Sequence, residues 1–144
     1  MQSFAAESCT KKAAEDKVNE VCKSIEEKGM DAKKDWPKGL KYDNCGKNYV
    51  WVQDTDADIK MVMHPIKTHL DNTSLKDTKT KKGKRLFFDF DKEAKAAKAG
   101  LWAAPYDWPD GEIDRDKVSF VKLCKLKSGG AWIVGSGWWV SELK

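Results

Sequence analysis

Two polar side chains stand among aromatic residues in the second half of the chain. Lys117 and Ser119 alternate along a strand-like segment, so both side chains point to the same face. Tyr106 and Trp108 flank the loop that precedes them. A lysine at the start of a strand is often a solvated edge residue. Enclosed by rings, however, its ammonium offers a compact positive charge with three donors, which suits a carboxylate.

Trp51 and His64 extend this set of candidate ligand-binding residues. Trp51 shares one strand face with Tyr49, and His64 stands directly before Pro65 at the end of the next strand-like segment. A histidine in such a place is usually structural, yet its ring N–H can donate to an anion. As the base of a hydrolase, it would define the enzymatic alternative.

No catalytic motif accompanies these residues. The chain contains no Gly-rich phosphate loop, no GxSxG elbow and no HExxH helix. A hydrolase that used His64 would also need a nucleophile or a metal, and the sequence offers neither in a recognisable pattern. We therefore expect a binding domain without catalytic residues rather than an enzyme.

Metal ligation is not predicted either. Asp54, Asp56 and Asp58 alternate as at the start of an EF-hand loop, but Ile59 and Pro65 occupy the positions that need Gly and Glu. The cysteines form no CxxC pair, as a zinc site or an attached haem would require. The three aspartates are better interpreted as a hairpin turn, and we expect no metal and no cofactor.

The composition excludes two further classes of partner. The 27 basic and 23 acidic residues give a net charge of only +4, and the basic residues are scattered, whereas a nucleic-acid binder concentrates them. No stretch approaches the roughly 20 apolar residues of a membrane helix. Residues 1–6 lack the basic start and apolar run of a secretory signal. We expect no nucleic-acid partner, no membrane segment in this chain and a mild attraction for anions.

Hydrophobic periodicity predicts the elements that must position the candidate residues. A long helix spans about Thr10 to Lys28, with Thr10 as its N-cap and Gly29 at the C-cap position. A second helix begins at Leu86 and is closed by Gly100. Segments rich in β-branched and aromatic residues predict five strands, at 48–53, 59–63, 101–106, 117–125 and 131–139.

This order favours a single α+β domain of residues 1–144. Hairpin turns join the first two strands and the last two, and the second helix crosses between the two groups. The sheet would be antiparallel and five-stranded, with its core in residues 48–140. One face of such a sheet is left to form a pocket.

Four cysteines, Cys9, Cys22, Cys45 and Cys124, fit two disulfides in an oxidising compartment. Cys9 and Cys22 are thirteen residues apart, almost 20 Å on one helix, so they cannot pair with each other. The preferred arrangement is Cys22–Cys45 with Cys9–Cys124. The pairing Cys9–Cys45 with Cys22–Cys124 and four reduced core cysteines in a cytosolic protein remain alternatives.

Six strings resemble, in order, the single Cache domains (type 2) of bacterial extracytoplasmic sensors. They are YVWVQD at 49–54, MHPIK at 63–67, GKRLF at 83–87, YDWP at 106–109, KVSFVK at 117–122 and WIVGSG at 132–137. The long leading helix also matches that architecture. No one string is decisive, but six in register are a specific signal.

The resemblance implies a PAS-like fold, with the long N-terminal helix packed along the antiparallel sheet. It also implies one pocket for a small organic acid anion such as acetate, propionate, lactate or pyruvate. Motif positions that line or border this pocket fall on Trp51, His64, Tyr106, Trp108 and Lys117, with Ser119 as a weaker candidate. Family members sit in the bacterial periplasm or elsewhere outside the cytoplasm, and feed signal transduction or chemotaxis or act as free-standing binding proteins. The positions of Cys22 and Cys45 resemble a free-standing subset, which favours both the disulfides and the free-standing form.

Several residues depart from the family pattern. Phe120 replaces a common Tyr, so a hydroxyl near the pocket would be missing. The segment 101–105 is longer than usual and would bring Trp102 into or over the pocket. Trp138 and Trp139 are bulkier than the usual residues. A structural or partner-binding domain, its pocket collapsed around Trp102 and Trp138, is therefore a further alternative. A homodimer through the first helix is the protein partner that this architecture allows.

Overall fold

The long first helix forms as its sequence pattern predicts. The structure is a computed structural model that describes residues 10–36 and 48–143. In it, helix α2 (Lys11–Lys28) begins after Thr10, whose hydroxyl accepts a hydrogen bond of 3.2 Å from the N–H of Ala13. The helix ends at Gly29, where φ is +59°, a value that glycine adopts without strain. Its buried face consists of Ala14, Val18, Val21, Cys22 and Ile25.

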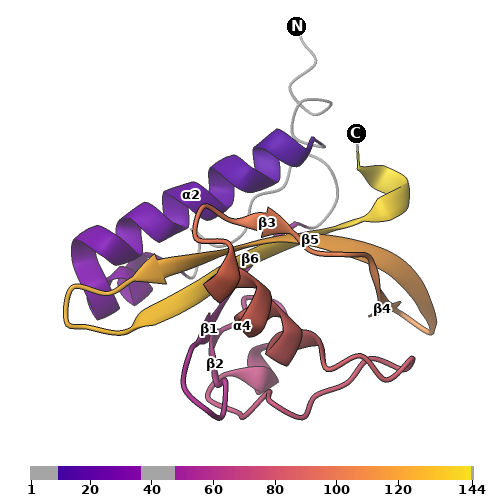
Figure 1. The fold of residues 1–144 in the computed structure, drawn as a ribbon. Coiled ribbons are helices and arrows are strands. Elements are labelled where there is room, and N and C mark those ends of the chain that lie inside the picture. The colour runs from indigo at the N-terminus through magenta and orange to yellow at the C-terminus, as the bar shows by residue number, and fades with distance from the viewer. Residues whose placement is uncertain (1–9, 37–47, 144) are drawn as a thin grey trace, which may run out of the picture.

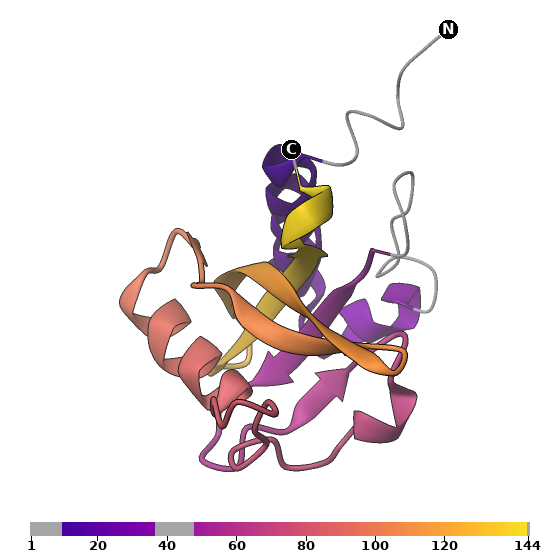
Figure 2. The ribbon, with the colours of Figure 1, turned by 90° about the vertical axis from the view of Figure 1, so that its right-hand side faces the viewer.

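A twisted antiparallel sheet forms the centre of the fold (Figures 1 and 2). Its strands are β1 (Val50–Asp54), β2 (Met61–Met63), β3 (Leu101–Trp102), β4 (Tyr106–Asp110), β5 (Ile113–Lys125) and β6 (Ala131–Trp139). They are ordered β2-β1-β6-β5-β3, and β4 also pairs with β5. Short 3-10 helices follow α2, β2 and β6, at η1 (Gly29–Asp35), η2 (Thr68–Leu70) and η3 (Val140–Glu142).

Helix α2 and a second helix, α4 (Leu86–Ala96), cover opposite faces of the sheet (Figure 1). On the α2 face, Val50, Val52 and Phe120 pack against the helix. On the other face, the buried side of α4 packs against Trp51 and Val121. Because side chains alternate along a strand, the buried residues of β1, β5 and β6 are divided between these two cores.

The predicted α+β, PAS-like architecture is confirmed, and the described residues form six strands where the sequence analysis expected five. The segment predicted as one strand at 101–106 is divided into β3 and β4 by residues 103–105. Strand β5 begins at Ile113, four residues before the predicted start at Lys117. The additional length pairs with β4 in a hairpin whose turn is at Gly111, where φ is +66°. The two loop residues are Gly111 and Glu112, and glycine is the residue that a type II′ hairpin turn favours at the first of these positions. Pro109 is tolerated because β4 pairs on one side only.

The preferred disulfide pairing of Cys22 with Cys45 is wrong, because Cys22 is bonded to Cys124. Cys22 lies on the buried face of α2, directly over β5, and the Cα atoms of the two cysteines are 5.4 Å apart. The bond is one half of the alternative pairing. The predicted pairing of Cys9 with Cys124 is wrong for the same reason, because Cys124 is already bonded to Cys22. Cys9 and Cys45, which the alternative would pair with each other, lie outside the described residues.

Two other expectations concern metals and membranes. The aspartate-rich segment after β1 is a turn, in which a side-chain oxygen of Asp54 accepts hydrogen bonds from the N–H groups of Asp56 and Lys60. Among the described residues, no group of His, Cys, Asp and Glu has the geometry of a metal site. In the same part of the chain, no helix has the length and apolarity needed to cross a bilayer.

Candidate functional site

Lys117 is a buried lysine near the start of β5, on the face of the sheet that α4 covers. Its neighbours across the ladder are Tyr106 of β4 and Trp139 of β6. Only 6% of its surface is exposed. The prediction that Lys117 lies among aromatic residues, rather than at a solvated edge, is therefore confirmed.

The Lys117 ammonium is enclosed by three rings. Nζ donates a hydrogen bond of 3.2 Å to the hydroxyl of Tyr49. It lies 4.8 Å from the ring centre of Tyr49, 5.9 Å from that of Trp108 and 5.0 Å from that of Trp139. Electron-rich ring faces stabilise a cation by about 0.5–2 kcal/mol each. The aromatic rings and the hydroxyl of Tyr49 thus stabilise the positive charge of Lys117.

Burial lowers the pKa of Lys117 from 10.5 to about 8. The charge of Lys67 lowers this pKa further, and Asp110 acts in the opposite direction. No carboxylate in the described part of the chain forms an ion pair with the Lys117 ammonium. At neutral pH most molecules therefore carry a desolvated cation that an anion from solution can neutralise.

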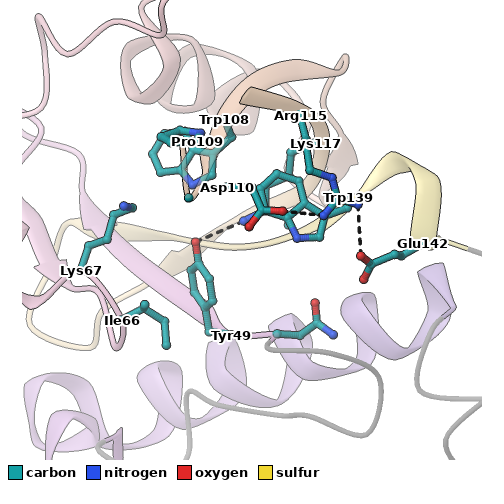
Figure 3. A pocket seen from close by; sticks show the side chains of 13 residues that line it. Tyr49, Ile66, Lys67, Trp108, Pro109, Asp110, Arg115, Lys117, Trp139 and Glu142 are labelled. Carbon is teal, nitrogen blue, oxygen red and sulfur yellow. Dashed lines mark hydrogen bonds and ion pairs between the residues drawn. The ribbon is translucent and has the colours of Figure 1, made fainter. Parts of the chain in front are cut away.

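Two cavities lined by described residues share this lysine, and Figure 3 shows the outer one. The outer cavity has a volume of about 410 Å³ and is lined by Asn48, Tyr49, Ile66, Lys67, Trp108, Pro109, Asp110, Gly111, Arg115, Lys117, Gly137, Trp139 and Glu142. The inner cavity, of about 10 Å³, is lined by Tyr49, Trp51, His64, Leu86, Phe87, Phe90, Tyr106, Trp108 and Lys117. The inner cavity is about the size of one water molecule. Only the outer of these two cavities is therefore large enough for an acid, and Lys117 lies between the two cavities.

His64 lines the inner cavity and is held as a neutral ring. Its Nδ1 accepts hydrogen bonds from the backbone N–H groups of Ile66, at 3.2 Å, and Lys67, at 2.8 Å. Burial, and then the charge of Lys117, lower the pKa of His64 to about 3. The hydrogen is thus on Nε2, from which it can be donated. Because the lone pair of Nδ1 is already occupied, this ring is poorly placed to act as the base of a hydrolase.

Trp51, Tyr106 and Ser119 form the floor below the lysine. The indole N–H of Trp51 donates to Oε1 of Gln53 at 3.0 Å, so Trp51 presents only its ring to the inner cavity. The hydroxyls of Tyr106 and Ser119 are hydrogen-bonded to each other at 2.5 Å, and both residues are buried. Ser119 therefore supports Tyr106 beneath the cavities and is not part of either lining.

Trp102 lies on the opposite face of the sheet. Its indole N–H donates to a carboxylate oxygen of Glu15 on α2 at 2.6 Å, and its ring packs against Phe120. Trp138 packs on the same face, against Ala14. The expectation that Trp102 or Trp138 fills the pocket is wrong, and Phe120 likewise points away from it. Alternation along β3, β5 and β6 places all three residues against α2.

Of the thirteen residues that line the outer cavity, the sequence analysis had named only Trp108 and Lys117 as candidates. The residues it missed include Lys67, Arg115, Gly137 and Trp139. The guanidinium of Arg115 pairs with the carboxylates of Asp110 at 2.6 Å and Glu142 at 3.2 Å. It also stacks on the Trp139 ring, with 4.6 Å between the guanidinium carbon and the ring centre. A two-residue alternation from Lys117 would have found Arg115, because both lie on one face of the extended β5.

Gly137 gives the lysine its room. A Cβ atom at this position would lie 2.7 Å from Cε of Lys117 and 2.6 Å from Oγ of Ser119. Such distances are too short for any side chain to be accommodated without displacing its neighbours. The Gly-Ser-Gly run near the end of the chain was the available signal, since glycine in a strand often marks a close approach.

The family model for the Cache domain matches residues 12–144. The chain belongs to the Cache domain family. The resemblance seen in the six sequence strings is thereby confirmed. Cache domains are extracytoplasmic sensor domains of the kind found in chemotaxis receptors, and they bind ligands rather than catalyse reactions.

Solved structures of Cache-type sensors have the same fold. A periplasmic sensor domain of a chemotaxis protein is 28% identical, with 96% of this chain and 94% of that chain covered and a TM-score of 0.65. A Cache chemosensory domain, described for its carboxylic acid recognition, is 22% identical over 85% of this Cache domain and 84% of its own chain, with a TM-score of 0.63. A methyl-accepting chemotaxis protein from Vibrio parahaemolyticus is 16% identical, with 90% of this chain and 88% of that chain covered and a TM-score of 0.64.

Proposed function

We propose that this Cache domain captures a small organic acid anion in the bacterial periplasm, with Lys117 as the anchor of its carboxylate. It would feed signal transduction or chemotaxis, or act as a free-standing binding protein. The observation that carries the proposal is a buried ammonium, enclosed by rings, at the edge of a cavity of about 410 Å³. Similarity to a Cache domain that recognises carboxylic acids supports the choice of ligand.

The chemistry at Lys117 favours a carboxylate over a neutral ligand. An ammonium with three hydrogens has given one to the hydroxyl of Tyr49, so two further donors can serve a ligand. Hydrogen bonds between charged groups contribute roughly 1.5–3 kcal/mol each. Trp108 and Trp139 would cover the carbon atoms of the acid. An acid of so few atoms is limited to affinities of about micromolar or weaker.

Strand β5 connects the cavity with the long helix. Lys117 faces the cavity, while Cys124 of the same strand is bonded to Cys22 of α2 on the opposite face. A second connection runs through the C-terminal turn η3, where Glu142 pairs with Arg115 at the cavity and Leu143 packs near Ala14 of α2. Ligand binding that favours one arrangement of β5 and η3 would thereby be felt by α2.

Isothermal titration calorimetry against acids of about two to four carbons tests the proposal. We expect at least one acid to bind with a micromolar to millimolar dissociation constant, and Lys117→Met to reduce that affinity at least about tenfold. Lys125→Met is the matched control, because Lys125 is an exposed lysine on the same strand. Equal affinities for the parent and Lys117→Met, or a complete absence of binding, would contradict the proposal.

A further inference from the structure

A second ammonium faces the outer cavity from the side opposite Lys117. Lys67 follows the end of β2, and its Nζ lies 5.8 Å from the ring centre of Trp108. Nζ of Lys117 lies 5.9 Å from the same ring centre. Figure 3 shows the two side chains extending from opposite sides toward the hydroxyl of Tyr49. Two cations are thus placed around one indole ring, although the residues are fifty positions apart in the sequence.

Among the described residues of the cavity lining, the negative charges are paired with Arg115 and not with these two lysines. The carboxylates of the lining, on Asp110 and Glu142, are both paired with Arg115. Neither Lys67 nor Lys117 forms an ion pair with any residue in the described ranges. The charge of Lys67 is felt at its neighbour, since it lowers the pKa of Lys117. Two like charges in a partly desolvated cavity repel each other, and a ligand with two negative charges removes that repulsion.

We propose that the outer cavity selects a short dicarboxylate, with one carboxylate bound by Lys117 and the other by Lys67. This inference rests on the proposed function and specifies its ligand. A chain of about four carbons, with N–O contacts of about 2.8 Å at each end, can bridge two ammonium groups around one indole. The face of Trp108 covers the methylene groups between them. A monocarboxylate satisfies one lysine and leaves the other to water.

Matched pairs of acids with the same carbon number provide the test. Propionate and malonate, butyrate and succinate, and valerate and glutarate are each titrated by calorimetry at pH 7 and low salt. For the best pair, we expect the diacid to bind roughly tenfold or more tightly than the monoacid, the effect of one additional charged hydrogen bond. Inorganic phosphate is titrated as a compact, multiply charged anion without a carbon chain.

Lys67→Met identifies the source of the preference. We expect this variant to bind the diacid as weakly as the monoacid, while monoacid affinity changes by no more than about twofold. Lys98→Met removes the same charge from an exposed site outside the cavity lining and should retain the diacid preference. Near-ultraviolet circular dichroism checks that both variants are folded.

Three results would overturn the inference alone, because binding of monoacids would still support the proposed function. They are equal affinities within every pair, a diacid preference that persists in Lys67→Met, and phosphate binding more tightly than any diacid. Failure of every acid to bind would overturn the proposed function and this inference together.

Discussion

Replacing Lys117 with methionine should stabilise the ligand-free domain while removing its ligand anchor. The pKa of Lys117 is lowered from 10.5 to about 8, chiefly by burial, so the unfolded chain binds this proton more tightly than the folded one. The free energy of unfolding therefore increases as the pH rises from about 8 toward 10.5, and it is lowest with respect to this group below pH 8.

The magnitude follows from the shift. Lowering the pKa from 10.5 to about 8 corresponds to about 3 kcal/mol of destabilisation below pH 8. Methionine has a similar length without the charge, but it leaves the Tyr49 hydroxyl without its donor, at a cost of about 1 kcal/mol. We expect Lys117→Met to be about 2 kcal/mol more stable than the parent at pH 7. That advantage should shrink by about 2 kcal/mol on going to pH 9.5.

Urea denaturation of both proteins at pH 7 and pH 9.5, in buffers without carboxylates, measures this difference. The comparison between the two proteins cancels every other titrating group. Work below pH 10 also avoids ionisation of tyrosines in the unfolded chain, which matters because burial raises the pKa of Tyr49 in the folded state. A Lys117→Met variant that is less stable than the parent at pH 7, or a difference independent of pH, would refute the reasoning.

Four further outcomes follow from the same structure. Anion affinity should fall about tenfold between pH 7 and pH 9, because the charged fraction of Lys117 falls through its pKa of about 8; calorimetry in both buffers measures it. Burial keeps the pKa of His64 near 3, so the free energy of unfolding falls as the pH is lowered from 6.5 toward 3. By pH 4.5, urea titrations should show a loss on the order of 3 kcal/mol from this histidine, and His64→Asn should lack that part of the loss. Gly137→Ala should weaken acid binding at least about tenfold in calorimetry, because its Cβ would lie 2.7 Å from Cε of Lys117. Reduction of Cys22–Cys124, which spans 102 residues, should lower the free energy of unfolding by about 2–5 kcal/mol, and a Cys22→Ser, Cys124→Ser double variant should lack this response.

The elements and their buried faces were predictable because they depend on local patterns. The apolar spacing of α2 identified its buried face residue by residue, and Thr10 and Gly29 marked its ends. The segment predicted for the last strand, 131–139, agrees with β6 at both ends. The strand division around residues 103–105 was not predicted, because a short interruption leaves the composition of the segment strand-like.

Only the part of the candidate site around Lys117 was predictable from the sequence. Placing Lys117 beside Tyr106 and Trp108 required no more than strand alternation and closeness in sequence. Lys67 and Trp139 could not be found in this way, since the loop after β2 and the register of β6 bring them to the cavity. The choice of Cys124 as the partner of Cys22 likewise depends on which strand lies under the long helix.

The sequence alone specifies which residues face the same side of each helix and strand, because the repeat of the local backbone sets that choice. It also determined that one lysine would stand among aromatic rings. How the faces combine depends on the folded arrangement of the strands: Trp102 and Phe120 pack under α2, and Lys67 joins Lys117 around one cavity. The physical reason is that strand order and register are set by packing between distant segments, so contacts across the sheet are not encoded in any single stretch of chain.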